Sequence, residues 1–444
     1  MGSEPIDITA KLRRREPTSW WNAVRRRHAF DSDTSQGHRS AINEASARFE
    51  RFAPLIARLF PETIAAGGHI RSALIPVDRV AALLGLDRSA GRLFVKGDHD
   101  LPISGSVKAR GGIHAVLTIA EEVAGAHELL GDESYASLTG PAARTVFAAR
   151  HISVGSTGNL GLSVGTMASA LGFSASVHMS LEAKEWKKRR LRDIGAKVIE
   201  HAGDYAQALA TARTSAALDP TCFFIDDEDS RPLLYGYATG AQELADQLDE
   251  AGVRVDDEHP LIVHLPCGVG GAPAGIALGL HLIFGASVHC FFAEPVDSPC
   301  FTLEMMTEDG SHPSVYDAGL SGETEADGLA VPRASLLAVG IARAIIAGTF
   351  TVTDETMLRY LHLAAATEEL QLEPSAAAGI GGPVMLRDTP QEQLRKADLA
   401  GRLDDATQVI WTTGGRLMPD EEHHALAERG RALRHALMTT GEHK

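Results

Sequence analysis

The sequence has few cysteines, no long hydrophobic run and no excess of basic residues. Its four cysteines, Cys222, Cys267, Cys290 and Cys300, stand far apart in 444 residues, and none has a partner at C-x-x-C spacing. This scarcity argues against a disulfide framework and against a zinc ligand set. Residues 1–30 lack the apolar core of a signal peptide, and no apolar run approaches membrane-spanning length. We therefore expect a cytoplasmic protein that does not enter a membrane.

The charge balance is acidic. The chain has 58 Asp and Glu residues against 42 Lys and Arg, which gives a formal net charge of −16. A protein that binds nucleic acid needs a basic face to contact phosphates, so we expect no nucleic-acid partner. Hydrophobic residues make up 44% and charged residues 23%, as is usual for a globular protein. The length allows two domains, or one large domain with a second lobe.

From about residue 90 the sequence alternates short β-branched or aromatic runs with longer helical patterns. The predicted strands are 92–96, 174–179, 197–201, 222–225, 261–265, 288–293 and 408–411. Helical patterns between them include 185–194, 205–218 and 238–251, and the first 80 residues look mostly helical. This alternation is typical of βαβ units, in which parallel sheets carry helices on both faces. Ligands of such sheets gather beyond the carboxyl ends of the strands.

Lys108 is the first candidate functional residue. It lies at the predicted start of a helix, after a Ser/Gly turn and before Arg110 and a pair of glycines. In isolation such a lysine is normally a surface charge. Here the small neighbours would let its amine face a cleft, and a lysine with a lowered pKa can form a Schiff base and then act as a general base.

Two further loops enter predicted helices. The segment Ser156-Thr-Gly-Asn159 offers hydroxyls and amides suited to a carboxylate, although Ser, Thr and Asn are also ordinary helix caps. The segment 266–275, P-C-G-V-G-G-A-P-A-G, offers backbone N–H groups at a helix start, which is how proteins hold a phosphate. It could also be a structural turn, or a dinucleotide loop with Glu294 as the ribose-binding acid. Pro273 stands where the third glycine of G-x-G-x-x-G belongs, which weakens the dinucleotide interpretation.

Together these segments resemble the fold-type II enzymes that use pyridoxal phosphate (PLP), the superfamily of tryptophan synthase β and threonine dehydratase. Residues 236–243, G-Y-A-T-G-A-Q-E, are similar to that superfamily's G-x-G-T-x-x-x-E segment. The likeness is closer to the family of bacterial D-serine dehydratases (D-serine ammonia-lyases). Its motifs run in order from about residue 50 to 420: L-P-I-S-G-S-V-K-A-R-G-G-I, V-G-S-T-G-N-L-G-L-S, C-F-F-I-D-D-E, L-P-C-G-V-G-G, H-C-F-F-A-E-P, D-G-L-A-V, L-E-P-S-A and a C-terminal T-G-G.

The resemblance implies an α/β fold of two parallel-sheet αβα domains with the active site between them. A large PLP-binding domain would comprise residues 1–112 and 236–444, and residues 113–235 would form a smaller, mobile αβ domain. The resemblance also implies a monomer that converts D-serine to pyruvate and ammonia by β-elimination.

The same resemblance implies a role for each candidate residue. PLP would be bound covalently by Lys108, and Asn159 would contact its phenolic oxygen. Ser156 and Thr157 would bind the substrate carboxylate, and Lys108 or a hydroxyl such as that of Thr157 would take the Cα proton. Thr413 would contact the pyridine nitrogen; a hydroxyl does not enforce a protonated ring, which favours prompt elimination. The phosphate would be held by Gly268, Val269, Gly270, Gly271 and Ala272.

Three segments depart from the family pattern or modify it. Ala272 and Ala274 replace expected glycines, and an added Cβ can displace the phosphate or forbid a positive φ. Arg416 stands where a third glycine is expected, so it could reshape the rim of the site. Residues 294–300, E-P-V-D-S-P-C, resemble a cation-binding E-P-S-N-A-D-D segment. Glu294 and the Ser298 carbonyl would suit potassium or sodium better than a small divalent ion; the alternative is that Glu294 caps a helix or pairs locally.

Other functions remain open at this point. The same fold could carry a serine racemase, a threonine or 3-hydroxyaspartate dehydratase, or a β-replacing synthase. An NAD-type dehydrogenase built on the glycine loop and Glu294 is a more distant alternative. A binding protein without catalysis is a third, which the presence of Lys108 disfavours.

Overall fold

The computed structural model describes residues 7–25, 29–86, 91–130, 135–156, 158–202 and 205–440. The chain divides into two compact units, and each contains one sheet. Unit 1 comprises residues 1–31, 73–99 and 241–444, and unit 2 comprises residues 32–72 and 100–240. These bounds differ from the predicted domains in that residues 32–72, 100–112 and 236–240 belong to unit 2.

Unit 1 is built on a seven-stranded sheet of order β1-β10-β9-β8-β11-β3-β2. Its strands are β1 (Ser19–Trp21), β2 (Leu74–Pro76), β3 (Arg92–Lys96), β8 (Leu261–Pro266), β9 (Val288–Pro295), β10 (Gly348–Val352) and β11 (Thr407–Trp411). The five strands from β10 to β3 are parallel, and the edge strands β1 and β2 are antiparallel to their neighbours. The central strands are buried along their whole length, as expected when helices cover both faces of a parallel sheet.

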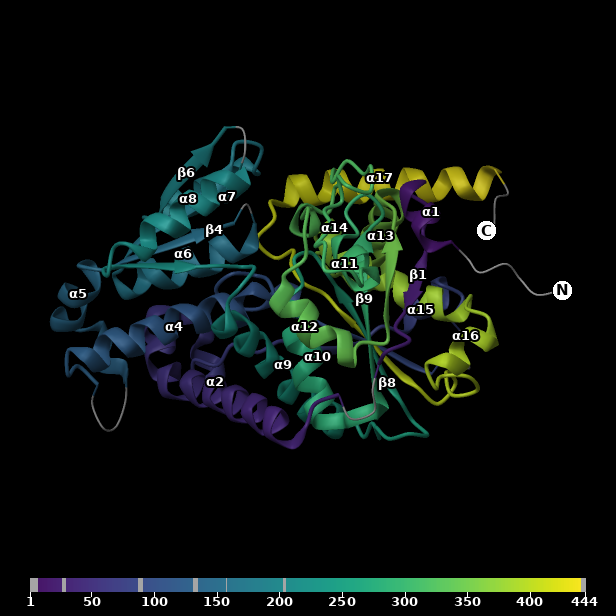
Figure 1. Ribbon diagram of the computed structural model, residues 1–444, viewed down its shortest axis with the longest axis horizontal. Helices are drawn as coiled ribbons and strands as arrows, with labels where there is room; N and C mark the ends of the chain where they lie inside the picture. Colours follow the sequence, from purple (N-terminus) through teal and green to yellow (C-terminus); the bar gives the residue numbers. More distant parts are fainter. Residues whose placement is uncertain are drawn as a thin grey trace. The chain divides into compact units, whose positions relative to one another are not determined.

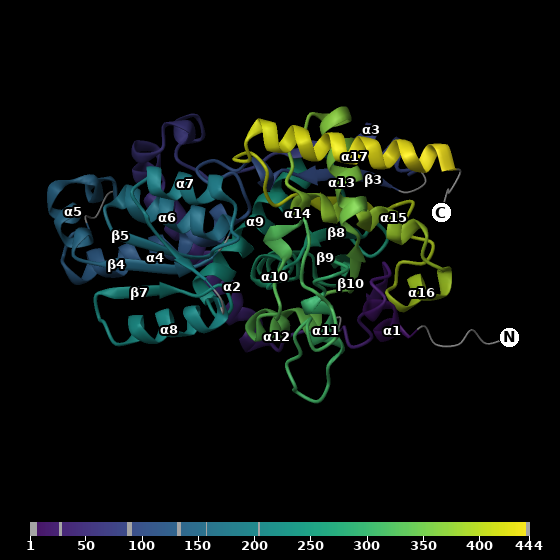
Figure 2. The same ribbon diagram turned by 90° about the horizontal axis from the view of Figure 1, so that it is seen from above.

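The helices of unit 1 cover this sheet (Figure 1). They are α1 (Ile8–Arg13), α3 (Asp78–Leu83), α10 (Gly271–Phe284), α11 (Cys300–Met306), α12 (Leu336–Ile345), α13 (Asp354–Glu368), α14 (Pro374–Ala377), α15 (Gly381–Arg387), α16 (Gln391–Lys396) and α17 (Asp420–Thr440). Figure 2 shows α13 and α17 side by side, away from α10 and α12. Phe291 of β9 and Phe350 of β10 anchor the core under α15 and α16; burying each contributes roughly 1.5–3 kcal/mol.

Unit 2 is built on a four-stranded parallel sheet of order β6-β5-β4-β7. Its strands are β4 (His151–Gly155), β5 (Ser174–Ser180), β6 (Lys197–His201) and β7 (Cys222–Ile225). Its helices are α2 (Ser32–Leu59), α4 (Lys108–Ala126), α5 (Pro141–Ala148), α6 (Asn159–Leu171), α7 (Glu185–Asp193) and α8 (Tyr205–Ala217). Helix α9 (Arg231–Glu250) begins in unit 2 and ends in unit 1.

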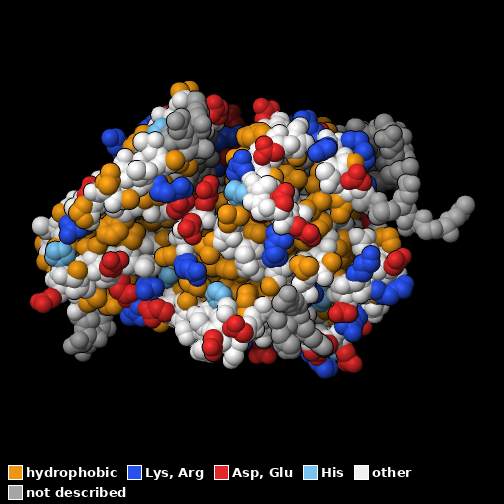
Figure 3. All heavy atoms as spheres, in the orientation of Figure 1, with side chains coloured by type: hydrophobic (Ala, Val, Ile, Leu, Met, Phe, Trp, Pro, Cys, Tyr) orange, Lys and Arg blue, Asp and Glu red, His pale blue; other side chains and the backbone are white. Residues whose placement is uncertain are grey.

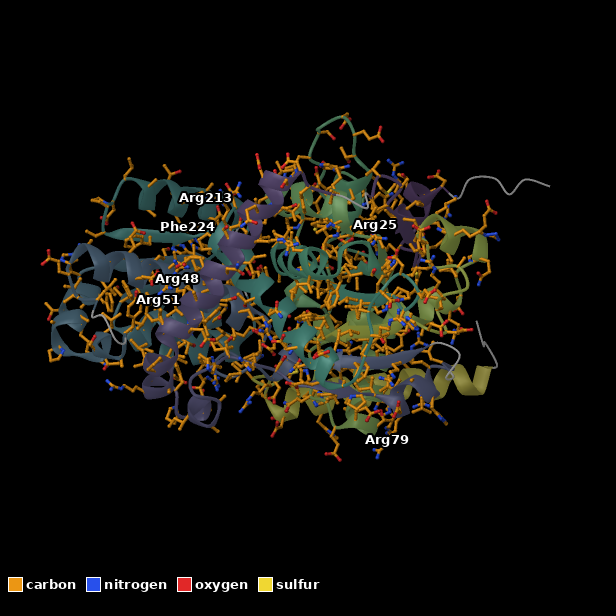
Figure 4. The ribbon with its side chains drawn as sticks, turned by 90° about the horizontal axis from the view of Figure 1, so that it is seen from below. Arg25, Arg48, Arg51, Arg79, Arg213 and Phe224 are labelled. Atoms are coloured by element: carbon orange, nitrogen blue, oxygen red, sulfur yellow. The ribbon has the colours of Figure 1, made fainter. Side chains whose placement is uncertain are left out.

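Charged contacts link the helices of unit 2. Arg48 and Arg51 project from α2 (Figure 4), and both guanidinium groups bind Glu121 of α4, at 2.7 and 2.8 Å. The Arg213 guanidinium of α8 lies over the Phe224 ring of β7, 5.8 Å from its centroid. These contacts join α2 to α4 and α8 to β7 within unit 2.

On the face shown in Figure 3, Lys and Arg side chains are interspersed with Asp and Glu rather than gathered into one basic area. Among the described residues, no helix is both long enough and apolar enough to cross a bilayer.

Candidate active site

The predicted site residues are divided between the two units. Ser156, Asn159 and Lys108 lie in unit 2, and the glycine loop, Glu294, Ser298 and Thr413 lie in unit 1. Thr157 lies outside the described residues. Each group is built by short segments that follow a strand or open a helix, as expected for ligand-binding residues of α/β units.

Lys108 is the first residue of α4 and follows a strained turn. The Ser104 amide donates to the Pro102 carbonyl at 2.9 Å, which closes a three-residue turn around Ile103. Ile103 has a φ of +75°, a left-handed conformation that a β-branched residue rarely adopts. Backbone strain of this kind concentrates at functional sites.

The glycine pair after Lys108 makes room for an aromatic ring. A Cβ on Gly111 would lie 2.3 Å from the ring of Tyr237 in α9, so only glycine lets that ring pack against the backbone of α4. The Lys108 ammonium lies over the same ring, 5.4 Å from its centroid. Tyr237 is fully buried, and burial raises the pKa of its hydroxyl.

Asp227 is the charge partner of Lys108. Its Oδ1 lies 3.6 Å from the Lys108 Nζ, two residues beyond the end of β7. Burial acts to lower the pKa of Lys108, but Asp227 and Tyr237 together outweigh burial, and the pKa is raised above its ordinary value. This is the opposite of the lowered pKa that we expect from the sequence, because the sequence does not reveal that Asp227 is close.

Two polar atoms around Lys108 lack partners. The hydroxyl oxygens of Ser104 and Ser106 are buried and form no hydrogen bond within the described part of the chain. A buried, unsatisfied hydroxyl costs about 1–3 kcal/mol. These atoms are therefore suited to meet polar groups of a ligand.

The 156–159 segment joins β4 to α6. Ser156 Oγ accepts a hydrogen bond from the Gly158 amide at 3.2 Å, and Gly158 caps α6 without a side-chain hydrogen bond. The first amides of α6 have no partner within the helix and can bind an anion. Lys187 adds positive charge: it is 2% exposed, and its Nζ lies 3.9 Å from the position of a Cβ on Gly158. No motif in the sequence singles out Lys187.

In unit 1, the glycine loop follows β8 and opens α10. Gly270 has a φ of +106°, and a Cβ there would lie 2.3 Å from the Phe301 ring, so glycine is required. The buried amides of Gly268, Val269 and Gly270 donate no hydrogen bond within the described chain, and the first amides of α10 have no acceptor in the helix. A row of unpartnered amides at a helix N-terminus is suited to a phosphate.

Ala272 and Ala274 lie inside α10 and are buried. Neither is among the residues with a positive φ. The concern that these alanines force a left-handed conformation is therefore wrong: their positions are helical, where alanine is favoured over glycine.

Thr413 follows β11. Its Oγ1 is buried and has no hydrogen-bond partner among the described residues. A hydroxyl without a hydrogen-bond partner fits the predicted contact with the ring nitrogen of PLP, because the two groups can form a hydrogen bond with each other. Arg416, the expected modifier of the rim, is exposed.

Glu294 caps α11. Its two carboxylate oxygens accept hydrogen bonds from the Phe301 amide at 2.7 Å, the Thr302 amide at 2.9 Å and the Thr302 hydroxyl. Glu294 therefore has the local capping role that was the alternative to a cation site in the sequence. Burial raises the pKa of Glu294 to about 7. Ser298 Oγ is bound to the backbone of Val331, at 3.0 and 3.1 Å.

A family model for pyridoxal-phosphate dependent enzymes matches residues 66–399. The chain belongs to this family. Its donor set agrees with that assignment, since unit 1 offers a loop of unpartnered amides and an unpartnered hydroxyl, and unit 2 offers a partly buried lysine beside a carboxylate.

Three relatives of similar length share the name "Probable D-serine dehydratase". The chain is 52% identical over 434 residues, 96% of each chain, to a "Probable D-serine dehydratase" of Acidovorax ebreus. It is 49% identical to one of Burkholderia lata over 97% of this chain and 96% of that protein. It is 48% identical to one of Pseudomonas aeruginosa over 94% of each chain.

Solved structures share the fold of this PLP-dependent enzyme. Escherichia coli diaminopropionate ammonia lyase, in complex with an aminoacrylate-PLP azomethine, matches with a TM-score of 0.68 at 18% identity, covering 94% of this chain and 98% of that one. The processed form of a threonine deaminase from Solanum lycopersicum matches with a TM-score of 0.61 at 17% identity, covering 91% of this chain and 90% of that one. These likenesses confirm the fold-type II α/β architecture.

Proposed function

We propose that this enzyme is a D-serine dehydratase, which converts D-serine to pyruvate and ammonia with PLP as its cofactor. The observation that carries the proposal is the 52% identity, over 96% of the chain, to a protein named as a probable D-serine dehydratase. The partly buried Lys108–Asp227 pair supports it, because covalent binding of an aldehyde cofactor needs an amine held in a polar pocket.

Each part of the site has a task in this proposal. Lys108 binds the cofactor covalently, and its amine, once released, moves the Cα proton. Ser156 and Thr157 bind the substrate carboxylate, with Lys187 adding positive charge nearby. Asn159 holds the phenolic oxygen. PLP, when bound, draws electrons from the Cα and so allows the β-hydroxyl to leave.

Unit 1 supplies the remaining contacts. The amides of Gly268, Val269, Gly270, Gly271 and Ala272 hold the phosphate, and Thr413 donates to or accepts from the ring nitrogen. A monovalent cation, potassium or sodium, binds Glu294 and the Ser298 carbonyl. Each carboxylate oxygen has two lone-pair directions, so one direction on Glu294 Oε1 is left beyond the capping bonds. We further propose that the enzyme works as a monomer in the cytoplasm.

The test is product analysis over a panel of D- and L-serine, D- and L-threonine and D-3-hydroxyaspartate. We expect equal amounts of pyruvate and ammonia from D-serine at the highest kcat/KM, and none from the Lys108→Ala variant, which should also lack the visible absorption band of the bound cofactor. Release of L-serine in place of pyruvate, or a higher kcat/KM for any other member of the panel, would overturn the assignment of D-serine.

A further inference from the structure

A buried hydrogen-bonded chain lies next to Thr413. Thr412 Oγ1 donates to the Lys96 carbonyl at 3.0 Å and lies 2.7 Å from Nδ1 of His99. Because the single hydroxyl proton of Thr412 is used on Lys96, the His99 Nδ1 must carry the proton and donate to Thr412. Thr412 and Lys96 are completely buried, and His99 is 5% exposed.

Backbone contacts join the same two segments. The Thr412 amide donates to the Lys96 carbonyl at 3.1 Å, and the Arg416 amide donates to the His99 carbonyl at 3.1 Å. The Trp411 indole donates to Asp98 Oδ2 at 2.9 Å. The segment after β3 therefore holds the segment after β11 both before and after Thr413.

The far side of Thr413 is held as well. The Gly414 carbonyl accepts a hydrogen bond from the Glu373 amide at 3.0 Å. A Cβ on Gly415 would lie 2.0 Å from the Gln371 carbonyl oxygen, so the backbone there cannot shift toward that segment. Thr413 is left with little freedom, although its own hydroxyl has no partner among the described residues.

We propose that His99 is a positioning residue for the reaction. Through its hydrogen bond to Thr412, it holds the hydroxyl of Thr413 in the orientation that meets the pyridine nitrogen of the cofactor. This inference rests on the proposed function, since it takes the contact of Thr413 with the ring from it. His99 acts through Thr412 and Thr413 and has no part in moving substrate protons.

The test uses the full-length holoenzyme with His99→Ala, His99→Asn, Thr412→Val and Thr413→Val. For each variant, the dissociation constant of PLP, the visible absorption maximum and the ratio of pyruvate to L-serine formed from D-serine are measured, together with the Tm. We expect His99→Ala and Thr412→Val to weaken PLP binding about fivefold, as for the loss of one hydrogen bond. Both variants should also shift the absorption maximum and the product ratio in the same direction as Thr413→Val does. His99→Asn should restore wild-type values, because its amide can donate from nearly the same place.

The double variant His99→Ala, Thr413→Val gives the decisive comparison. If His99 acts through Thr413, its loss adds nothing further to the PLP dissociation constant or product ratio once the Thr413 hydroxyl is gone. Additive effects, or a His99→Ala variant that changes only the Tm, would overturn the inference. If Thr413→Val itself changes none of these quantities, the contact of Thr413 is wrong and the inference falls with it, while the substrate panel still decides whether the enzyme acts on D-serine.

Discussion

Replacing Asp227 with asparagine removes one negative charge from beside Lys108 and keeps the shape of the side chain. At 3.6 Å, the attraction between two unit charges is about 1 kcal/mol in a water-like dielectric and about 5 kcal/mol at an effective constant of 20. The two side chains are 19% and 27% exposed, so the value lies between these limits. One pKa unit corresponds to about 1.36 kcal/mol, and the Asp227→Asn change should therefore lower the pKa of Lys108 by about one to three units.

The assay follows covalent attachment of the cofactor. Cofactor-free protein is mixed with PLP over a range of pH, and the growth rate of the visible absorption band is recorded. Only the unprotonated amine attacks the aldehyde, so below the pKa of Lys108 the rate rises about tenfold for each unit by which the pKa falls. The Asp227→Asn profile should lie at lower pH than the wild-type profile.

Asp226→Asn is the matched control. Asp226 is the adjacent residue, but its Oδ2 binds Arg213 at 2.7 Å rather than Lys108. Its removal should leave the attachment profile in place. Coincident profiles for Asp227→Asn and the wild type, or an equal shift in both variants, would refute the assignment of the raised pKa to Asp227.

The ion pair between Lys108 and Asp227 should also make the free energy of unfolding of the cofactor-free protein depend on pH. Because the folded-state pKa of Lys108 is raised, the ion pair stabilises the folded protein fully below the unfolded pKa of a lysine, about 10.4. That stabilisation is lost as the pH rises through the folded pKa. The difference in the free energy of unfolding between wild type and Asp227→Asn should thus be constant near neutral pH and decrease only in strong alkali.

Three further outcomes are expected. Thr413→Asp should increase racemisation or transamination per elimination, because a carboxylate would protonate the ring nitrogen. The measurement compares the L-serine and 3-hydroxypyruvate formed with the pyruvate formed, and an unchanged ratio would mean that Thr413 does not contact the ring. Ala272→Gly and Ala274→Gly should leave the PLP dissociation constant unchanged and lower the free energy of unfolding by about 1 kcal/mol each, as measured by urea denaturation; tighter PLP binding would show that the alanines do strain the loop. Potassium should activate the enzyme after dialysis into a buffer of bulky organic cations, and Glu294→Ala should abolish that activation. EDTA should have little effect, and full activity without potassium would exclude the cation site.

The sequence predicted the framework of both sheets from the alternation of apolar strands and helical patterns. All seven predicted strands are present, with ends that differ by no more than two residues. Strand β4, H-I-S-V-G, was missed because only two of its residues are aliphatic, and its polar Ser153 is buried within the sheet. Strand β10, G-T-F-T-V, was missed for a similar reason. Its alternating threonines are typical of a strand with one solvent-exposed face, but both threonines are buried in the sheet.

The candidate site was predictable only where its chemistry depends on neighbours in sequence. Lys108, the 156–159 segment and the glycine loop each carry small residues or helix-start signals within a few positions. Asp227 lies in the motif C-F-F-I-D-D-E, but it is one of several acids in a row and is 119 positions from Lys108 (227 − 108), so the motif does not tell which acid meets the lysine. Only the end of a parallel strand, where ligand-binding residues gather, singles it out.

The alanines of the glycine loop, Ala272 and Ala274, show why spacing alone does not tell where glycine is required. From the sequence, each glycine that the family expects in the loop is equally a candidate for a positive φ. Within the loop, a positive φ occurs only at Gly270, where the Phe301 ring of α11 also excludes a Cβ. Two residues later the backbone is already helical, so a methyl group at 272 or 274 costs nothing in conformation and gains helix propensity. The distinction depends on where α10 begins, and the structure fixes that start at Gly271, after which glycine has no conformational advantage.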